Sequence, residues 1–373
     1  LNVNVVAALA VTLLLWGGAP AESPVADAAM RGDVEHVRGL LREGADVNAA
    51  QGDGMTALHW AAETGNVELA EMLLYAGANV GAVTRLGDYS PLHLAARSGR
   101  VGVVEVLVEA GANVTAVTST GGVTPLHFGA ASGRVDVVNA LIAGGAPIDA
   151  REEKWGQTPL MFASSAGRTD VVRALVDAGA DVGLTTRVVD IPTLAAEDRA
   201  AGGIRDQVID AFRGDQPPGT SWQPSPAEVQ AAVRAANQAS VEGQDAPAQR
   251  RDEPLPDPDL GTMLMSSGEN PGEYSNSYTD LVYRQGGLTA LHHAVREGEV
   301  ETTMALLDGG ADIDQRTAGD LTPPMVMAVI NGHYDLALML LERGADPNLG
   351  SHAGTTPLYA AINTYWAPKA RYP

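Results

Sequence analysis

The stretch TALHWAAETGNVELAEMLLYAGANV, residues 56–80, places two short helical patterns on either side of one glycine, and the chain then repeats it. Steps of 34 residues from its first position lead to a hydroxyl residue each time: Thr56, Ser90, Thr124 and Thr158. The same step from its central glycine leads to further glycines: Gly65, Gly99, Gly133 and Gly167. A third series, which starts at Gly77, keeps this register. The chain is therefore built from tandem repeats.

Each copy has the pattern of a helical hairpin. In three copies a proline follows the hydroxyl residue, at Pro91, Pro125 and Pro159. This order is typical of a helix start, because the hydroxyl caps a free amide and proline needs no N–H at the first helical position. The turn glycine permits a reversal, and apolar residues at helical spacing then run from Val67 to the glycine that ends the second helix.

Helices of two to three turns are not stable alone in water, so neighbouring copies must stack to bury their apolar faces. The small pairs, such as Ala61-Ala62 and Ala95-Ala96, allow the first helices of successive copies to lie close together. The second helices carry bulkier valine and leucine side chains. This difference in width predicts a curved stack with a concave face.

The copy starts TALH, SPLH, TPLH and TPLM, each followed by a glycine nine residues after the hydroxyl and a GA pair twelve further on, resemble the ankyrin repeat. A 34-residue period also occurs in tetratricopeptide repeats, but their Trp, Leu-Gly and Tyr positions are absent here. The resemblance implies an all-α ankyrin-repeat solenoid of stacked helix-turn-helix units with finger loops. A Pro-rich acidic insert interrupts it.

The repeats fall into two blocks. Residues 22–186 hold a divergent N-terminal copy and four regular copies, and residues 287–373 hold two complete copies and one incomplete copy. In the second block, Pro323 takes the place of the capping hydroxyl, which predicts a weaker cap or one displaced to Thr322. The last copy has Tyr365 where the turn glycine belongs, so we expect a portion of the protein beyond it to be missing.

Between the blocks, residues 187–286 do not follow the 34-residue repeat pattern and hold ten of the 22 prolines. We expect this segment to be largely disordered, with one or two short helices at 194–212 and 225–236, the second begun by a Ser225/Glu228 capping box. The segment enters where a finger loop belongs, so the stack can remain continuous. Two separate stacks joined by a linker are the alternative.

The first 21 residues carry no charge, and their apolar run, Val5 to Trp16, is shorter than the roughly 20 residues that span a bilayer. An Ala-Pro-Ala tripeptide follows the run. We therefore expect residues 1–21 to be a signal peptide that is cleaved after Ala21, and the mature protein to be periplasmic or secreted. An uncleaved anchor and a buried first helix are the alternatives. The start at Leu1, without a basic residue, suggests an incomplete N-terminus.

The formal net charge of −22 predicts repulsion of nucleic acid and of anionic lipid, so we expect a protein partner and no nucleic acid. There are no cysteines, which excludes disulfides, thiolate metal sites and cysteine nucleophiles. We find no nucleophile with a base, no paired acids and no phosphate-binding loop, and therefore expect no catalysis and no cofactor. We expect a monomer without a stable membrane span after signal cleavage.

Two columns of side chains recur with the repeat. Imidazoles stand at His59, His93, His127 and His292, and could be imagined as a metal ladder or a row of bases. The resemblance instead implies a structural residue that ties the helix start to the neighbouring turn. The next column, Trp60, Leu94, Phe128 and Phe162, is read as core rather than as an aromatic recognition stripe. His293 and His333 are expected to be surface or edge residues.

The resemblance also implies where a partner would bind. Positions before each capping hydroxyl and before each turn glycine face the groove in ankyrin stacks, and aromatic, Met and Arg side chains dominate interface energies. The candidates are Met55, Glu63, Thr64, Tyr89, Arg97, Ser98, Val123, Trp155, Gln157 and Arg296.

We expect an exported, non-catalytic protein that binds another protein through the concave face. The alternatives are an enzyme or enzyme accessory with its active part in the insert or in a missing C-terminal region, and a self-associating structural component of the cell envelope.

Overall fold

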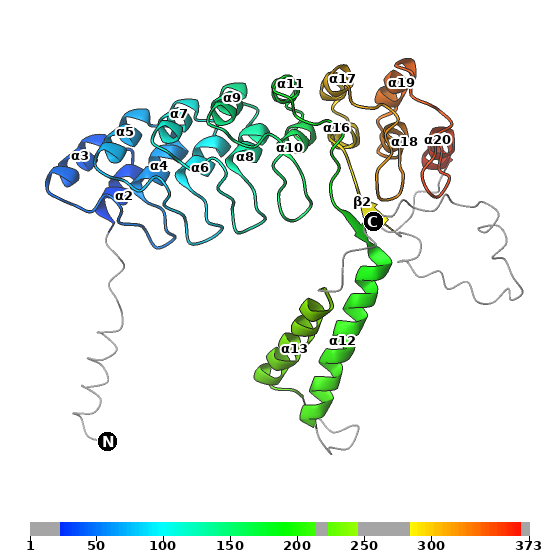
Figure 1. Ribbon diagram of the computed structural model, residues 1–373, viewed down its shortest axis with the longest axis horizontal. Coiled ribbons are helices and arrows are strands. Elements are labelled where there is room, and N and C mark those ends of the chain that lie inside the picture. Colours follow the sequence, from blue (N-terminus) through cyan, green and yellow to red (C-terminus); the bar gives the residue numbers. More distant parts are fainter. Residues whose placement is uncertain (1–22, 214–222, 245–283, 367–373) are drawn as a thin grey trace, which may run out of the picture.

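The computed structural model describes residues 23–213, 223–244 and 284–366, and the predicted signal peptide lies outside them. Helical hairpins stack side by side in two layers, with finger loops along one edge (Figure 1). The inner helices are α2 (Pro24–Met30), α4 (Ala57–Thr64), α6 (Pro91–Arg97), α8 (Pro125–Ser132), α10 (Pro159–Ser165), α16 (Ala290–Glu297), α18 (Pro324–Ile330) and α20 (Pro357–Trp366). The outer helices are α3 (Val34–Arg42), α5 (Val67–Tyr75), α7 (Val101–Glu109), α9 (Val135–Ala143), α11 (Thr169–Asp177), α17 (Val300–Asp308) and α19 (Tyr334–Glu342). The predicted all-α solenoid of stacked hairpins is confirmed.

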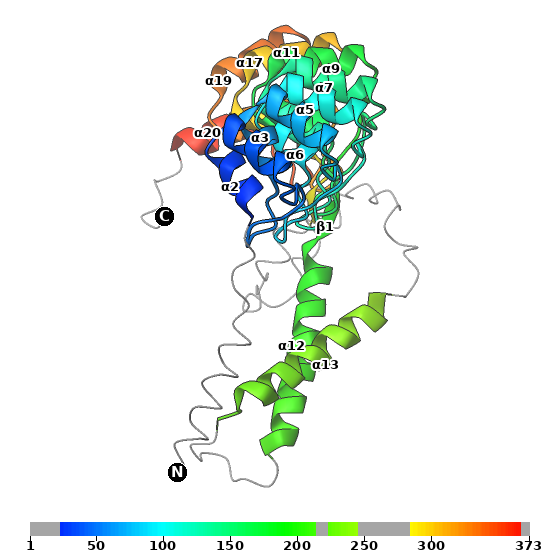
Figure 2. The ribbon, with the colours of Figure 1, turned by 90° about the vertical axis from the view of Figure 1, so that its left-hand side faces the viewer.

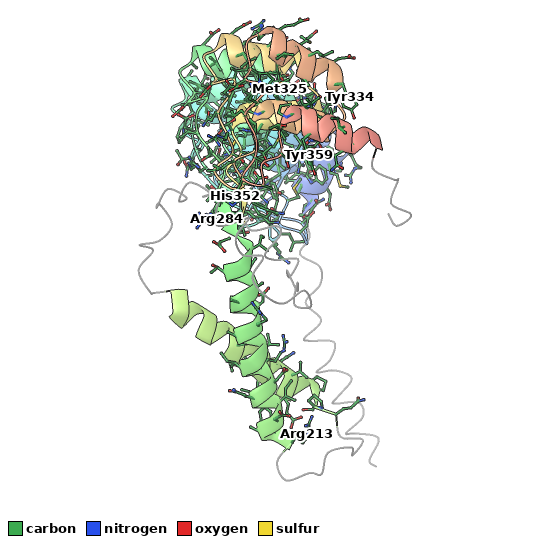
Figure 3. The ribbon with its side chains drawn as sticks, turned by 90° about the vertical axis from the view of Figure 1, so that its right-hand side faces the viewer. Arg213, Arg284, Met325, Tyr334, His352 and Tyr359 are labelled. Carbon is green, nitrogen blue, oxygen red and sulfur yellow. The ribbon has the colours of Figure 1, made fainter. Side chains whose placement is uncertain are left out.

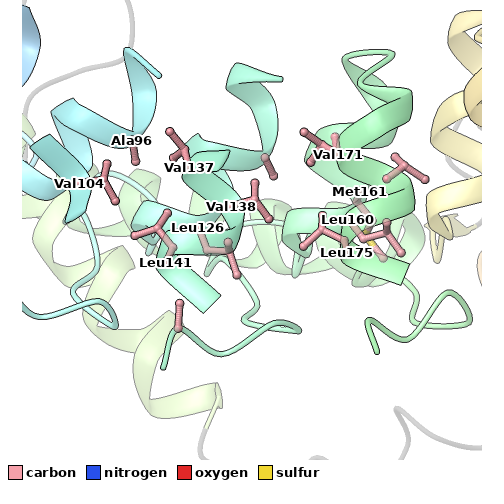
Figure 4. Packing of buried hydrophobic residues seen from close by; sticks show 14 of the residues in the cluster. Ala96, Val104, Leu126, Val137, Val138, Leu141, Leu160, Met161, Val171 and Leu175 are labelled. Atoms are coloured by element: carbon pink, nitrogen blue, oxygen red, sulfur yellow. The ribbon is translucent and has the colours of Figure 1, made fainter. Parts of the chain in front are cut away.

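The core runs along the stack between the two helix layers (Figure 4). Each outer helix contributes fully buried side chains, such as Val137, Val138 and Leu141 of α9. The inner helices α4, α6, α8, α10 and α16 each add a buried leucine, such as Leu126 of α8. A hairpin therefore buries its apolar side chains only because a neighbour covers them.

The recurring histidines of α4, α6, α8 and α16 each join their repeat to the next, as predicted. The Nδ1 atom of His59 accepts from the backbone N–H of Thr56 over 3.1 Å, so its Nε2 carries the ring proton and donates to the carbonyl of Tyr89 over 3.0 Å. The remaining histidines reach the finger of the following repeat in the same way, with His93 to Val123, His127 to Gln157 and His292 to Thr322 at 3.0–3.2 Å. Each imidazole thus holds the cap of its own helix and the finger of its neighbour.

A second inter-repeat contact covers the turn glycines. The side chain of Arg100 lies over Gly65, so that a Cβ at this glycine would come within 2.6 Å of the arginine Cδ atom. Its Nε donates to the carbonyl of Glu63 over 3.4 Å, at the carboxyl end of the preceding inner helix. Arg134 and Arg168 repeat this position over Gly99 and Gly133.

The fingers form one ladder of backbone hydrogen bonds along the stack. One N–H of each finger donates to a carbonyl of the preceding finger, from Arg85 to Asp53, Ser119 to Gly87, Glu153 to Gly121, Arg187 to Trp155, Ala318 to Gly287 and His352 to Asp320. The ladder passes from the first block of repeats into the second. In addition, α10 packs on α16 and α11 packs on α17, so the blocks form one continuous stack.

The insert leaves and re-enters this stack at the tip of a finger. Strand β1 (Val188–Asp190) pairs antiparallel with β2 (Arg284–Gly286), with Val188 opposite Gly286. Gly287 has a φ of 67°, and the equivalent finger residues Asp88 and Gly122 also have positive φ. The backbone therefore resumes the ordinary finger conformation directly after β2.

Two helices of the insert project beyond the fingers and pack on each other (Figure 2). They are α12 (Ile191–Arg213) and α13 (Pro226–Gln244), and the second extends eight residues beyond the predicted end at 236. The predicted capping box is present, since Glu228 accepts from the N–H of Ser225 over 2.7 Å. The remainder of the expected disordered stretch lies outside the described residues.

The last two repeats show what an absent cap or turn glycine does. Pro323 is the N-cap of α18 and supplies no side-chain hydrogen bond, while the hydroxyl of Thr322 donates to Asp320 instead. The cap is therefore lost rather than displaced. Helix α20 continues through Tyr365, where the other copies turn.

The Arg100 contact can be tested with two glycine variants. Gly65→Ala and Gly77→Ala both force alanine into positive φ, at a cost of about 1 kcal/mol each. Only Gly65→Ala also meets a neighbour, because a Cβ at Gly77 would have nothing within 4 Å. We expect Gly65→Ala to lose about 1 kcal/mol more in urea denaturation, since it displaces the arginine and its hydrogen bond. In an Arg100→Ala background this difference should vanish, and equal losses in the native background would contradict the contact.

Candidate functional site

Three of the predicted groove residues meet in one cluster. The Nη2 atom of Arg97 donates to Oε2 of Glu63 on the preceding inner helix over 3.1 Å. The same guanidinium lies over the ring of Tyr89, 5.7 Å from its centroid, and that ring lies 5.9 Å from the ring of Phe128. The cluster therefore presents an aromatic face, a cation and an anion across adjacent repeats.

The other finger candidates lie in the same column but are less prominent. Met55, Val123 and Gln157 are half-buried, and the carbonyls of Val123 and Gln157 accept from the preceding histidines. Of the two polar candidates on the inner helices, Thr64 is exposed and donates back to the carbonyl of Trp60, and Ser98 is half-buried at the helix end.

Trp155 stands apart from the cluster, on the next finger but one. The buried carboxylate of Glu152 accepts from the backbone N–H groups of Lys154, Trp155 and Gln157 over 2.5–3.0 Å, which fixes the turn of this finger. The indole remains 48% exposed, with Nζ of Lys154 5.4 Å from its ring centroid. Arg296 pairs only with its neighbour Glu297 among the acids described. The structure thus brings Glu63, Tyr89 and Arg97 together and leaves Trp155 and Arg296 separate.

Comparison with known proteins gives the family. A profile described as "Ankyrin repeats (3 copies)" matches residues 9–84, 25–118, 115–186 and 257–351, which together exceed half of the chain. The chain belongs to the ankyrin-repeat family. Ankyrin repeats are in general protein–protein interaction modules.

The similar relatives each match only a short part of this ankyrin-repeat chain. The B-cell lymphoma 3 protein homolog of Mus musculus is 36% identical over 85 residues, which are 23% of this chain and 19% of the relative. The human protein phosphatase 1 regulatory subunit 27 is 39% identical over 71 residues, 19% of this chain and 46% of the relative. The potassium channel AKT1 of Oryza sativa subsp. indica is 42% identical over 62 residues, which are 17% of this chain and 6% of the relative. The chain therefore spans less than half the length of each.

No other chemical site is evident in the described part of the ankyrin stack and its insert. Within residues 23–213, 223–244 and 284–366, no group of three or more His, Asp or Glu side chains is placed to hold a metal ion. Searching the same described residues, we also find no helix with the length and apolar character needed to cross a membrane.

The predicted surface position of His293 is wrong. Its side chain is only 3% exposed, because it lies on α16 in the column of Trp60, Leu94 and Phe128 rather than on the outer side of that helix. Neither ring nitrogen has a hydrogen-bond partner among the described residues. Burial, the Arg296 guanidinium and the His292 ring lower the pKa of His293 to about 4. His333 is half-buried, and its Nε2 meets the carbonyl of Arg296 at 2.9 Å, in the position that Arg100 has over Gly65.

The aromatic column is less uniformly buried than predicted. Leu94 is buried, whereas Trp60, Phe128 and Phe162 are half-buried at the edge of the core. The Nε1 of Trp60 donates to Gln51 over 2.9 Å, which gives its polar edge a partner near the surface. Phe128 therefore contributes both to packing and to the exposed cluster with Tyr89, a role that the core interpretation missed.

His293 and its neighbour provide a matched pair of substitutions. We expect His293→Phe to stabilise the protein by about 1–3 kcal/mol, because it replaces a buried ring with unsatisfied nitrogens by the type of side chain found elsewhere in the column. His292→Phe should destabilise it by about 2 kcal/mol, because that ring bonds to Thr289 and Thr322. Urea denaturation at pH 7 measures both changes, and a destabilised His293→Phe would contradict the assignment.

The His293→Phe variant should also differ from the native protein in how its stability depends on pH. Because the folded-state pKa of His293 lies near 4 and the unfolded value near 6.5, the unfolded state binds a proton first as the pH falls. This group therefore costs stability progressively from about pH 6.5 down to about pH 4, and nothing above that window. At pH 5 the advantage of His293→Phe over the native protein should be about 2 kcal/mol larger than at pH 7. An unchanged difference would contradict a buried neutral imidazole.

Proposed function

We propose that this ankyrin-repeat chain is a non-catalytic binding module that holds a partner protein on its concave face. The observation that carries the proposal is the cluster of Glu63, Tyr89, Arg97 and Phe128, which comes from three successive repeats. Tyrosine and arginine, together with tryptophan, are enriched at the energetic centre of protein interfaces.

The geometry of the cluster supports this role. The Arg97 guanidinium is held between a carboxylate and an aromatic ring, so little side-chain freedom is lost when a partner binds it. An exposed ion pair of this kind contributes about 1 kcal/mol or less to folding stability. Removal of the cluster should therefore weaken binding without unfolding the stack.

The character of the relatives is consistent with the proposal. The human relative is named as a regulatory subunit of a phosphatase, and 46% of its length matches this chain. The net charge of −22 favours a basic partner over an acidic one. The uncharged apolar N-terminal pattern supports a further proposal, that the module is exported and meets its partner in the periplasm or outside the cell.

Affinity capture with matched variants tests the concave face. Residues 22–373 are immobilised and exposed to periplasmic and secreted fractions, beside a Tyr89→Ala/Arg97→Ala variant. The control is Tyr75→Ala/Arg173→Ala, which removes the same side-chain types from outer helices α5 and α11, where Tyr75 is 97% exposed. We expect a partner that is bound by the native protein and the control, and bound at least tenfold more weakly by the groove variant, as for loss of an interface centre.

Retention of the partner by the groove variant, with loss in the control, would move the site to the convex side. Loss in neither variant would contradict a concave site built on this cluster.

A further inference from the structure

A hollow of about 340 Å³ lies at the C-terminal end of the finger row, where the insert returns to the stack. Three successive fingers contribute to it, and its lining includes Arg284, Leu288, Asp320, Met327 and His352. Figure 3 shows Arg284 and His352 together at the end of the stack from which α12 projects. The volume is at the lower end of the roughly 300–1,000 Å³ of small-molecule sites, which suits one large side chain rather than a folded element.

The walls of the hollow are fixed by hydrogen bonds within the protein. Strand β2 is held by its ladder with β1, and the N–H of Ala318 donates to Gly287 over 3.0 Å on the other side. The third finger is held by the N–H of His352, which donates to the carbonyl of Asp320 over 2.7 Å. The hollow is therefore formed before any guest arrives, so that binding does not have to order it.

The carboxylates near the hollow already have partners. Asp320 accepts from the hydroxyls of Thr317 and Thr322 over 2.6 and 2.7 Å. Asp190 accepts from Nε of Arg284 over 3.1 Å. The apolar side chains of Leu288 and Met327, the latter 8% exposed, line the interior, and exposed Gln285 and Ala353 lie at the rim.

The side chains at the equivalent positions of an earlier repeat pair indicate which kind of group fits the hollow. Leu288 occupies the column of Tyr89, and Met327 occupies the column of Phe128. Tyr89 and Phe128 fill the corresponding space with two rings whose centroids are 5.9 Å apart. At the C-terminal end both positions carry smaller aliphatic side chains, and the hollow lies beside them. The equivalent pair Tyr89 and Phe128 fills this volume with aromatic rings.

We propose that this hollow receives an aromatic side chain from a basic segment of the partner protein. The aromatic preference follows from the packing of Tyr89 and Phe128, and the basic character follows from charge complementarity with a chain of net charge −22. The proposal rests on the proposed function, because the hollow lies in the same finger column as the Tyr89 cluster. It adds an anchor point that only the insert completes, since β2 supplies one wall.

Methyl NMR of the full chain labelled with 13C-methyl methionine tests the hollow without a known partner. The probe is the peptide Ac-Lys-Lys-Trp-Lys-Lys-NH2, and the matched control replaces its tryptophan with alanine. We expect the tryptophan peptide to move the Met327 resonance, assigned by its loss in Met327→Leu, through the ring current of the bound indole. The nine other methionines serve as internal controls. The alanine peptide should bind at least tenfold more weakly.

Two variants fill the hollow from within the chain. Leu288→Tyr supplies the side chain present at Tyr89, and Ala353→Leu narrows the exposed rim if the first variant folds poorly. Both should abolish the Met327 shift, whereas Val123→Tyr, in the same column but on a finger outside the lining, should preserve it. An acidic analogue, Ac-Glu-Glu-Trp-Glu-Glu-NH2, should bind more weakly than the basic peptide.

Equal shifts from the alanine peptide, an unchanged shift in Leu288→Tyr, or no shift at Met327 would overturn the aromatic site. Equal or tighter binding of the acidic peptide would overturn the basic character of the guest. These outcomes are separate from the proposed function, which fails only if a partner captured by the native protein is retained by the Tyr89→Ala/Arg97→Ala variant.

Discussion

The hydrogen bond from an inner-helix imidazole to the finger of the next repeat is the main polar link between neighbouring repeats at His59, His93, His127 and His292. His59, for example, holds the cap at Thr56 through Nδ1 and the carbonyl of Tyr89 through Nε2. Helices of seven to ten residues have little stability alone, so each hairpin needs a neighbour that fixes its orientation. The imidazole fixes it at the point where helix, turn and finger meet. Burial keeps the ring neutral, since it lowers the pKa of His93 and of His292 to about 4.

This nearest-neighbour construction explains how the stack accommodates a long insert. Contacts between repeats involve the helices, the turn glycines and the base of each finger, whereas the finger tip makes a single ladder hydrogen bond. A segment that enters at the tip, between Val188 and Gly286, leaves those contacts in place. The insert also adds a wall to the finger row. The hollow beside Arg284 exists only because β2 returns to the stack in this register.

The regular part of the fold could be predicted from the sequence because its determinants are local or recur at a constant separation. Thr56, His59 and Gly65 each act within a few residues or on the next copy, so their spacing carries the information. The contacts that bring the two ends of the insert together could not be predicted in this way. Thr186 and Leu288 bond across 102 residues, and no periodic signal indicates that partnership. The polarity of His293 predicts a surface position, whereas its place in the column of Trp60 and Leu94 accounts for its burial.

In the candidate site, too, residue spacing predicts some features and not others. The positions of Glu63, Tyr89 and Arg97 follow from the repeat register, but the stacking of the guanidinium on the ring depends on side-chain conformations that no spacing encodes. The hollow depends on the sizes of side chains from three fingers at once. Such features arise from three-dimensional packing between repeats and not from residue spacing.

The repeats before and after the insert form one stack, coupled through ordinary neighbour contacts. Deletion of residues 189–285 would leave a finger from Thr186 to Thr289 with the same number of residues as the finger from Thr84 to Ser90. Urea unfolding of this variant should show a single transition, with the same midpoint as the stack in the full chain. Two separate transitions, or loss of the second block's helicity, would show that the two blocks of repeats do not form one coupled stack.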